Sequence, residues 1–163
     1  MPLALAEFNI ANPDELRPLL HACLAVPRWG EVVLLGRPYA ELSALVGAAE
    51  SASPLLPGEI AAAIAAHPRI GEKASGSGTG AGWSRSEQSG VDEAAAREFA
   101  DANIDYETRF GHVYLVCASG RSGEELLADL RSRLDNDPGT ELAVAGRELA
   151  KIAVLRLQKA VTA

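Results

Sequence analysis

The sequence contains little cysteine and histidine, and this limits the chemistry that it can support. It holds two cysteines, Cys23 and Cys117, and three histidines in 163 residues. The cysteines lie far apart among apolar neighbours, so we expect buried thiols in a reducing compartment rather than a disulfide framework. No HxxxH, HExxH or CxxC spacing occurs, and we therefore expect no metal site.

Further absences exclude other classes of protein. No apolar run approaches the roughly 20 residues that a membrane-spanning helix needs, and the first residues lack the basic region of a signal peptide. No cluster of Lys and Arg offsets the formal net charge of −7, so the surface should repel nucleic acid. We expect a protein that binds neither membrane nor nucleic acid, with the cytoplasm as its default location.

Helix-forming sequence covers most of the chain. Hydrophobic residues make up 48% and charged residues 23%, as in an ordinary globular domain. Asn12 and Ser122 are expected N-caps, and one helix is expected to begin at Pro38. Helices are predicted over residues 12–25, 37–51, 57–68, 84–111, 121–136 and 137–161. The fold prediction is all-α: a single domain over residues 1–163 with six to eight helices.

Three segments do not show a clear helical pattern. Residues 71–83, "GEKASGSGTGAGW", are rich in glycine and serine and are expected to form a loop without the ending of a P-loop. The segment "PRWGEVVLLG", residues 27–36, is ambiguous. The segment "HVYLVCA", residues 112–118, is rich in Val and Tyr as a strand would be. Since it has no clear partner strand, a buried extended or helical piece is the alternative.

Two residues stand out as candidates for acid–base chemistry. His67 lies where a helix should end, directly before Pro68, and an imidazole can hold or give a proton near neutral pH. Glu87 lies three residues after Ser84, so it can complete a capping box or face the same cleft as His67. The alternative for His67 is a purely structural ring at the helix C-terminus, stabilised by the helix dipole.

Two more residues leave alternatives open. His112 begins the strand-like segment, and a metal held by His67, Glu87 and His112 is conceivable but lacks a recognised ligand spacing. Arg156 lies on a mostly apolar face of the last predicted helix. Its guanidinium can either reach out to solvent or pair with an anion.

Four segments, taken in order, resemble one enzyme family. They are "AHPRIGEK", "SRSEQSGV", "RFGHVYLVCASGRSGEELLADL" and "ELAKIAVLRL". Together they are similar to the 2-oxo-4-hydroxy-4-carboxy-5-ureidoimidazoline (OHCU) decarboxylases of purine breakdown, from about residue 8 to residue 161. The resemblance implies an all-α enzyme, a homodimer, that acts on a small-molecule substrate without a cofactor. Its expected reaction converts OHCU to (S)-allantoin, after urate oxidation and hydrolysis of 5-hydroxyisourate.

The resemblance also implies roles for individual residues. His67 matches the catalytic histidine of the family, and Glu87 matches the glutamate that works with it. The implied substrate-binding residues are Pro68, Ser84, Gln88, the main chain of Tyr114, Leu115, Val116, Cys117 and Ala118, and Arg156.

The chain departs from the family pattern at one place. Many members have "FGFPF" where this chain has "FGHVY", so His112 and Val113 replace a Phe-Pro pair. Two alternatives therefore stay open beside the decarboxylase. One is a helical binding module in which His67 and Glu87 are caps alone. The other is a related lyase or hydrolase that acts on another ureido compound, with or without a metal.

Overall fold

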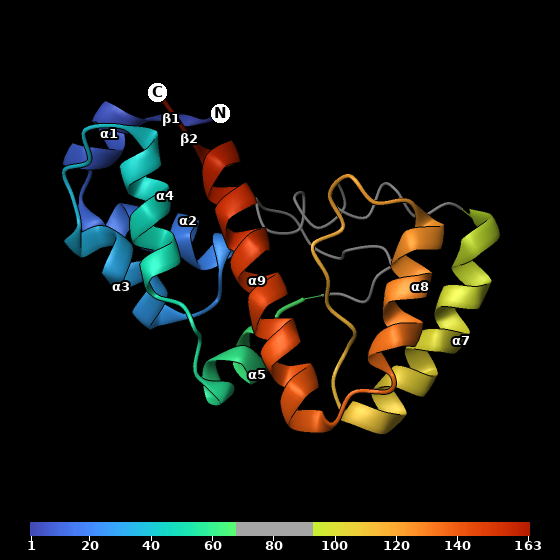
Figure 1. Cartoon of the computed structure of the whole chain (residues 1–163). Coiled ribbons are helices and arrows are strands. Elements are labelled where there is room, and N and C mark those ends of the chain that lie inside the picture. The colour runs from blue at the N-terminus through green and yellow to red at the C-terminus, as the bar shows by residue number, and fades with distance from the viewer. Residues whose placement is uncertain (68–92) are drawn as a thin grey trace.

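Eight helices and two short strands make up the described residues, 1–67 and 93–163 of the computed structural model (Figure 1). The elements are β1 (Leu3–Ala4), α1 (Leu5–Ile10), α2 (Pro13–Cys23), α3 (Pro27–Leu35), α4 (Leu42–Ser51), α5 (Pro57–Ala65), α7 (Glu93–Phe110), α8 (Gly123–Arg133), α9 (Pro138–Ala160) and β2 (Val161–Thr162). The all-α prediction is confirmed.

Helix α9 is the central element. It packs against α2, α4 and α5, and in Figure 1 it separates these helices from the α7–α8 pair. Asp137 caps its N-terminus by accepting a hydrogen bond from the Thr140 N–H at 3.1 Å, and Pro138 occupies the first turn. Although α9 is 23 residues long, no helix in the described ranges combines the length and apolar character needed to cross a bilayer.

The two ends of the described chain lie together. Strands β1 and β2 pair in parallel, with Leu3 opposite Val161 and Ala4 opposite Thr162. Figure 1 shows both termini beside the C-terminal end of α9. This short pairing joins α1 to the end of α9.

The buried apolar residues form two clusters. The first unites side chains from α1–α5 with the inner face of α9, including Phe8, Leu45 and Leu149. The second lies between α7 and α8 and is built around Phe99 and Leu126. Burial of this kind contributes about 25 cal/mol per Å² of apolar surface, so both clusters hold their helices in place.

The segment 112–118 runs between the two clusters. Tyr114, Val116 and Ala118 belong to the α7–α8 cluster, whereas Leu115 belongs to the first cluster and Cys117 packs against it. This alternation is typical of extended backbone, where successive side chains point to opposite faces. The segment pairs with no strand in the described residues, so of the alternatives left open, the buried extended piece is the one observed.

Several predicted helix ends can be compared with the structure. Asn12 caps α2 by accepting from the Asp14 N–H at 2.9 Å, and Ser122 caps α8. The ambiguous residues 27–36 contain α3, and α1 was not predicted. The predicted helix over 84–111 is present as α7 from residue 93, while residues 71–83 and 84–92 lie outside the described ranges.

The predicted helix start at Pro38 is wrong, because α4 begins at Leu42. The Tyr39 N–H donates to Asn9 Oδ1 at 2.8 Å, and Asn9 Nδ2 donates to the Tyr39 carbonyl at 2.9 Å. The Tyr39 hydroxyl donates to the Val33 carbonyl at 2.6 Å. These tertiary bonds hold the backbone at Tyr39 against α1 and so outweigh the local helix signal.

Candidate active site

His67 lies just beyond the C-terminal end of α5. The helix begins after Leu56, whose N–H donates to Glu59 Oε1 at 2.8 Å, and ends at Ala65. The His67 N–H still donates to the Ile64 carbonyl at 3.0 Å. This bond anchors the backbone of His67 to the last helical turn, while its half-buried ring leaves the helix.

The surroundings of His67 keep its imidazole uncharged. Burial, and then the positive charge of Arg156, lower the pKa of His67 from 6.5 to about 4. A ring stabilised mainly by the dipole of the α5 C-terminus would instead favour its protonated form. At neutral pH the ring is therefore a neutral group that can accept a proton.

Arg156 supplies the positive charge that lowers the pKa of this imidazole. It lies on the buried side of α9 with 4% of its surface exposed, so the solvent-reaching alternative is wrong. Its NH1 group donates to the Ala22 carbonyl, at the end of α2, at 2.9 Å. A guanidinium held in place and shielded from water is suited to bind an anion such as a carboxylate.

The segment 114–118 places main-chain groups beside the inner face of α9. The Cys117 N–H donates to Glu148 Oε1 at 3.3 Å, and Glu148 also pairs with Lys151 Nζ at 2.6 Å. Glu148 stands two helical turns before Arg156 on the same helix. The side chains of Tyr114, Leu115, Val116 and Ala118 are committed to the two apolar clusters. A ligand that meets this segment would therefore meet its main chain.

The predicted site residues fall into two groups. The structure brings His67 and Arg156 together, and sets segment 114–118 against α9. Pro68, Ser84, Glu87 and Gln88 lie outside the described residues. The pairing of His67 with Glu87 therefore stays a prediction.

Three buried charged residues near this region were not predicted from the sequence. Glu141, Glu148 and Arg133 are 0%, 6% and 4% exposed. Glu141 and Glu148 share the spacing of the apolar residues Ala145 and Ile152 on the inner face of α9. Charged residues at core positions of a helical pattern are rare unless they are paired, and this signal could have identified them.

His112 takes part in an aromatic cluster. Its ring stacks on Phe110 at 6.2 Å and meets Tyr106 edge-on at 5.6 Å between centroids. Its Nδ1 lies 3.1 Å from the Val113 carbonyl. In the part of the chain that the structure describes, no three His, Cys, Asp or Glu residues are grouped to hold a metal ion. The "FGHVY" departure thus contributes packing at this place.

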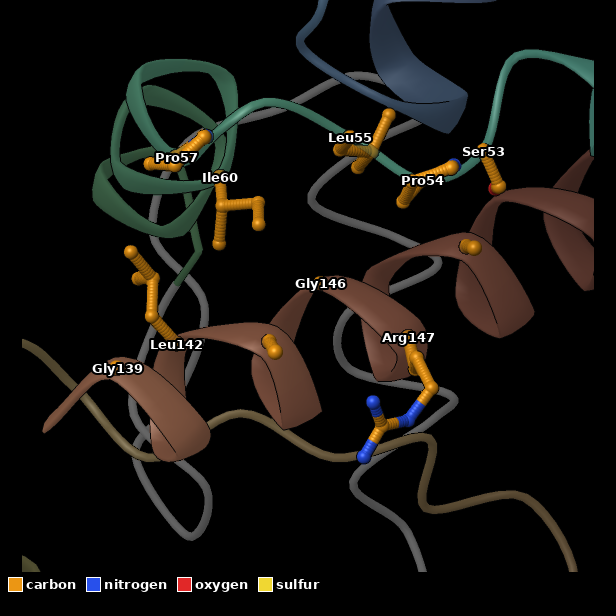
Figure 2. Close-up of a pocket in the computed structure, with 11 residues that line it drawn as sticks. Ser53, Pro54, Leu55, Pro57, Ile60, Gly139, Leu142, Gly146 and Arg147 are labelled. Atoms are coloured by element: carbon orange, nitrogen blue, oxygen red, sulfur yellow. The ribbon is translucent and has the colours of Figure 1, made fainter. Parts of the chain in front are cut away.

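A cavity of about 590 Å³ lies elsewhere, between the residues around α5 and one side of α9 (Figure 2). Figure 2 shows Leu55 and Ile60 facing Leu142 and Gly146 across it, with Arg147 at its edge. The lining is mostly apolar and, among the residues that the structure describes, includes none of the predicted site residues. It is therefore separate from the region of His67.

Several known proteins resemble this chain in sequence. A family model described as OHCU decarboxylase matches residues 9–158. The 2-oxo-4-hydroxy-4-carboxy-5-ureidoimidazoline decarboxylase of Amia calva is 32% identical over 131 residues, which is 76% of this chain and 74% of that protein. The uric acid degradation bifunctional protein TTL of Arabidopsis thaliana is 40% identical over 103 residues, 60% of this chain, and the chain spans about a third (32%) of its length.

Solved structures show the same fold. A crystal structure of OHCU decarboxylase in the presence of (S)-allantoin matches with a TM-score of 0.71 at 25% identity, covering 91% of this chain and 97% of that one. A crystal structure of (S)-allantoin synthase matches with a TM-score of 0.71 at 16% identity, covering 98% of this chain and 54% of that one, and supports the fold alone. Because the family model covers most of the sequence, the chain belongs to the OHCU decarboxylase family.

Proposed function

We propose that this protein is a carboxy-lyase that converts OHCU to (S)-allantoin and carbon dioxide. The family match and the named activities of its relatives support this assignment. The observation that carries it is a neutral, half-buried His67 near a buried Arg156. This pair combines a group that handles protons with a group that holds an anion.

The reaction does not need a cofactor to accept electrons. When the bond to the carboxylate breaks, its electron pair must move into an acceptor, which many decarboxylases obtain from pyridoxal phosphate or thiamine. OHCU carries a C=N bond next to the carbon that bears the carboxylate, and this bond accepts the electron pair. Carbon dioxide leaves, and the carbon that carried it becomes a carbonyl as its hydroxyl loses a proton. The neighbouring carbon, which bears the ureido group, takes up a proton and becomes the stereocentre of allantoin. The protein has to orient the carboxylate, exclude water and deliver the proton to one face.

Each site residue has a role in this scheme. Arg156 holds an anionic or carbonyl group of the substrate, and the main chain of segment 114–118 binds the ureido part. His67, paired with Glu87, orients the substrate and carries the proton, while Pro68, Ser84 and Gln88 complete the binding surface. General acid–base help of this kind contributes about 10²–10⁴-fold in rate. Since the spontaneous reaction yields both enantiomers, protonation from one side also explains a single product.

Substrate binding should change the proton affinity of His67. In the described structure the positive charge of Arg156 disfavours the imidazolium. A substrate carboxylate next to Arg156 offsets that charge, and an anion close to the ring favours its protonated form. The complex would therefore draw a proton onto His67 at the stage where the reaction needs one.

The test begins with urate, urate oxidase and the 5-hydroxyisourate hydrolase, and then adds this protein. We expect optically active allantoin to appear faster, as followed by circular dichroism. His67→Asn and Glu87→Gln should each reduce this gain by about 10²–10⁴-fold, with the helical spectrum unchanged. A racemic product at the spontaneous rate with the wild-type protein would refute the assignment.

The same experiment separates the alternatives. A binding module in which His67 is a cap predicts that His67→Asn leaves the rate of allantoin formation unchanged. A metal-dependent hydrolase predicts that a chelator removes the activity, whereas the proposed decarboxylase keeps it. A relative specific for another ureido compound predicts the spontaneous, racemic course with OHCU.

The assignment extends to the assembly and location of the protein. We propose a single OHCU decarboxylase-like domain over residues 1–163 that forms a homodimer in the cytoplasm and acts without nucleic acid, membrane, metal or cofactor. The net charge of −7 supports the absence of a nucleic-acid partner. Light scattering after size-exclusion chromatography would test the dimer, which a mass of about 17 kDa would contradict.

A further inference from the structure

A buried ionic network lies behind segment 112–118 and joins α7, α8 and α9. Glu141 accepts hydrogen bonds from Arg133 Nε, at 2.9 and 3.1 Å to its two oxygens, and from the Tyr106 hydroxyl. Asn136 Nδ2 donates to the same carboxylate at 3.1 Å. The Arg133 guanidinium also lies 4.7 Å from the centre of the Tyr114 ring. With Arg133 and Glu141 both less than 5% exposed, this network is shielded from water.

One atom of the network, Arg133 NH1, bonds the main chain that is proposed to bind the substrate. Arg133 NH1 donates to the Leu115 carbonyl at 2.8 Å and lies 3.4 Å from Asp129 Oδ2. That same Asp129 oxygen accepts the Tyr114 hydroxyl at 2.5 Å. Two consecutive residues of the segment are thus fixed to α8, one through its main chain and one through its side chain.

The segment depends on such side-chain contacts for its position. Within the described residues, no backbone group of residues 112–116 is hydrogen-bonded to another backbone group. A strand in a sheet is held in register by its ladder, and a helix by its internal bonds. Among the described residues, the bond from Arg133 to Leu115 and the bond from Cys117 to Glu148 fix its main chain to α8 and α9.

We propose that Arg133 is a positioning residue for the decarboxylation: by holding the Leu115 carbonyl, it sets the position of the 114–118 main chain that binds the ureido part of the substrate. This inference rests on the proposed function. Arg133 itself does not need to touch the substrate. Its effect is transmitted through the single hydrogen bond to the wall of the site.

Arginine suits this task better than lysine. Its guanidinium has a planar set of N–H donors, and Nε bonds Glu141 while NH1 bonds the Leu115 carbonyl. A lysine ammonium is a compact charge at the end of a flexible chain, so it can keep the ion pair with Glu141 but cannot reproduce both directions. Arg133→Lys therefore preserves the charge and removes the positioning.

The experiment compares three variants of the full chain in the allantoin assay at 25 °C and in calorimetric titration with (S)-allantoin. Losing the bond to Leu115 should raise KM and the Kd for (S)-allantoin about tenfold in Arg133→Lys, with kcat changed by less than about threefold. Tyr114→Phe, which releases the segment from Asp129, should raise both constants about threefold.

Tyr106→Phe is the matched control. It removes a tyrosine hydroxyl from a buried carboxylate of the same network, but Tyr106 lies on α7, outside the segment. Both constants should stay within about twofold of wild type, even where the melting temperature falls as far as in Tyr114→Phe. Should Arg133→Lys not fold, the two tyrosine variants decide.

Each outcome has one meaning. Wild-type constants in Arg133→Lys and Tyr114→Phe, or equal changes in Tyr106→Phe and Tyr114→Phe, would overturn the positioning role and leave the decarboxylase assignment intact. A wild-type protein that neither forms nor binds (S)-allantoin would remove the proposed function and this inference with it.

Discussion

Acid should destabilise this protein through His67, because the folded chain keeps that ring uncharged. Its pKa is about 4 in the folded protein and 6.5 for an unperturbed ring. Between these values the unfolded chain binds a proton that the folded chain does not, so the free energy of unfolding falls as the pH falls. Each tenfold difference in proton affinity is worth about 1.4 kcal/mol. The contribution of His67 from pH 7 to pH 4.5 is then a loss of about 2–3 kcal/mol.

His67→Asn isolates this contribution, because asparagine is polar but does not titrate. Urea unfolding followed by circular dichroism at several values between pH 7 and pH 4.5 gives the free energy of unfolding of each protein. The value for wild type minus that for His67→Asn should fall by about 2–3 kcal/mol over this range. The exposed His21 provides the control, since His21→Asn removes a histidine away from this environment. A difference between wild type and His67→Asn that stays constant within about 0.5 kcal/mol would show that the folded protein protonates the ring as readily as the unfolded chain does.

Three other predictions concern α9. Arg156→Gln removes the charge that disfavours protonation of His67, so the pKa of His67 should rise, as measured by NMR titration, and kcat/KM should fall about 10²-fold through loss of a charged substrate contact. Glu148→Ala removes the acceptor of a main-chain N–H and should cost about 1–2 kcal/mol in urea unfolding, whereas Glu148→Gln keeps an oxygen there and should cost less; equal losses would contradict this. Gly146→Ala places a Cβ 2.7 Å from Ile60 Cδ1, and this close approach should cancel the gain in helix propensity of about 1 kcal/mol. In the Ile60→Val background, which lacks Cδ1, the same substitution should raise the free energy of unfolding by about 1 kcal/mol. Equal effects of Gly146→Ala in the two backgrounds would refute the contact.

The helices could be predicted from the sequence where their signals are local. The Asn12 and Ser122 caps depend on residues within one turn of the helix end, and the structure has both of them. The start at Pro38 was wrong because Asn9 bonds the backbone of Tyr39. These partners are thirty residues apart, and a local pattern carries no information about such a contact.

Only part of the candidate site could be predicted from the sequence. The Val and Tyr content of "HVYLVCA" indicated a strand-like segment, but the presence of an apolar cluster on each side depends on how α7 and α8 pack against α9. The closeness of His67 and Arg156 likewise depends on the packing of α5 against α9. The order of the family motifs pointed to both residues, whereas neither periodicity nor composition could bring them together.

An all-α protein that binds a ligand through main-chain groups faces a structural conflict. Its helices use their N–H and C=O groups internally, so those groups are not available to a substrate except at helix ends. A non-helical segment can offer them, but a buried segment without a ladder needs other partners to fix it. Here Arg133 and Glu148, one from α8 and one from α9, contact the main chain at Leu115 and Cys117. Both are charged residues at positions that an apolar side chain would otherwise fill. In a helical sequence, buried charges of this kind beside a strand-like run therefore indicate where side chains hold a non-helical backbone in place.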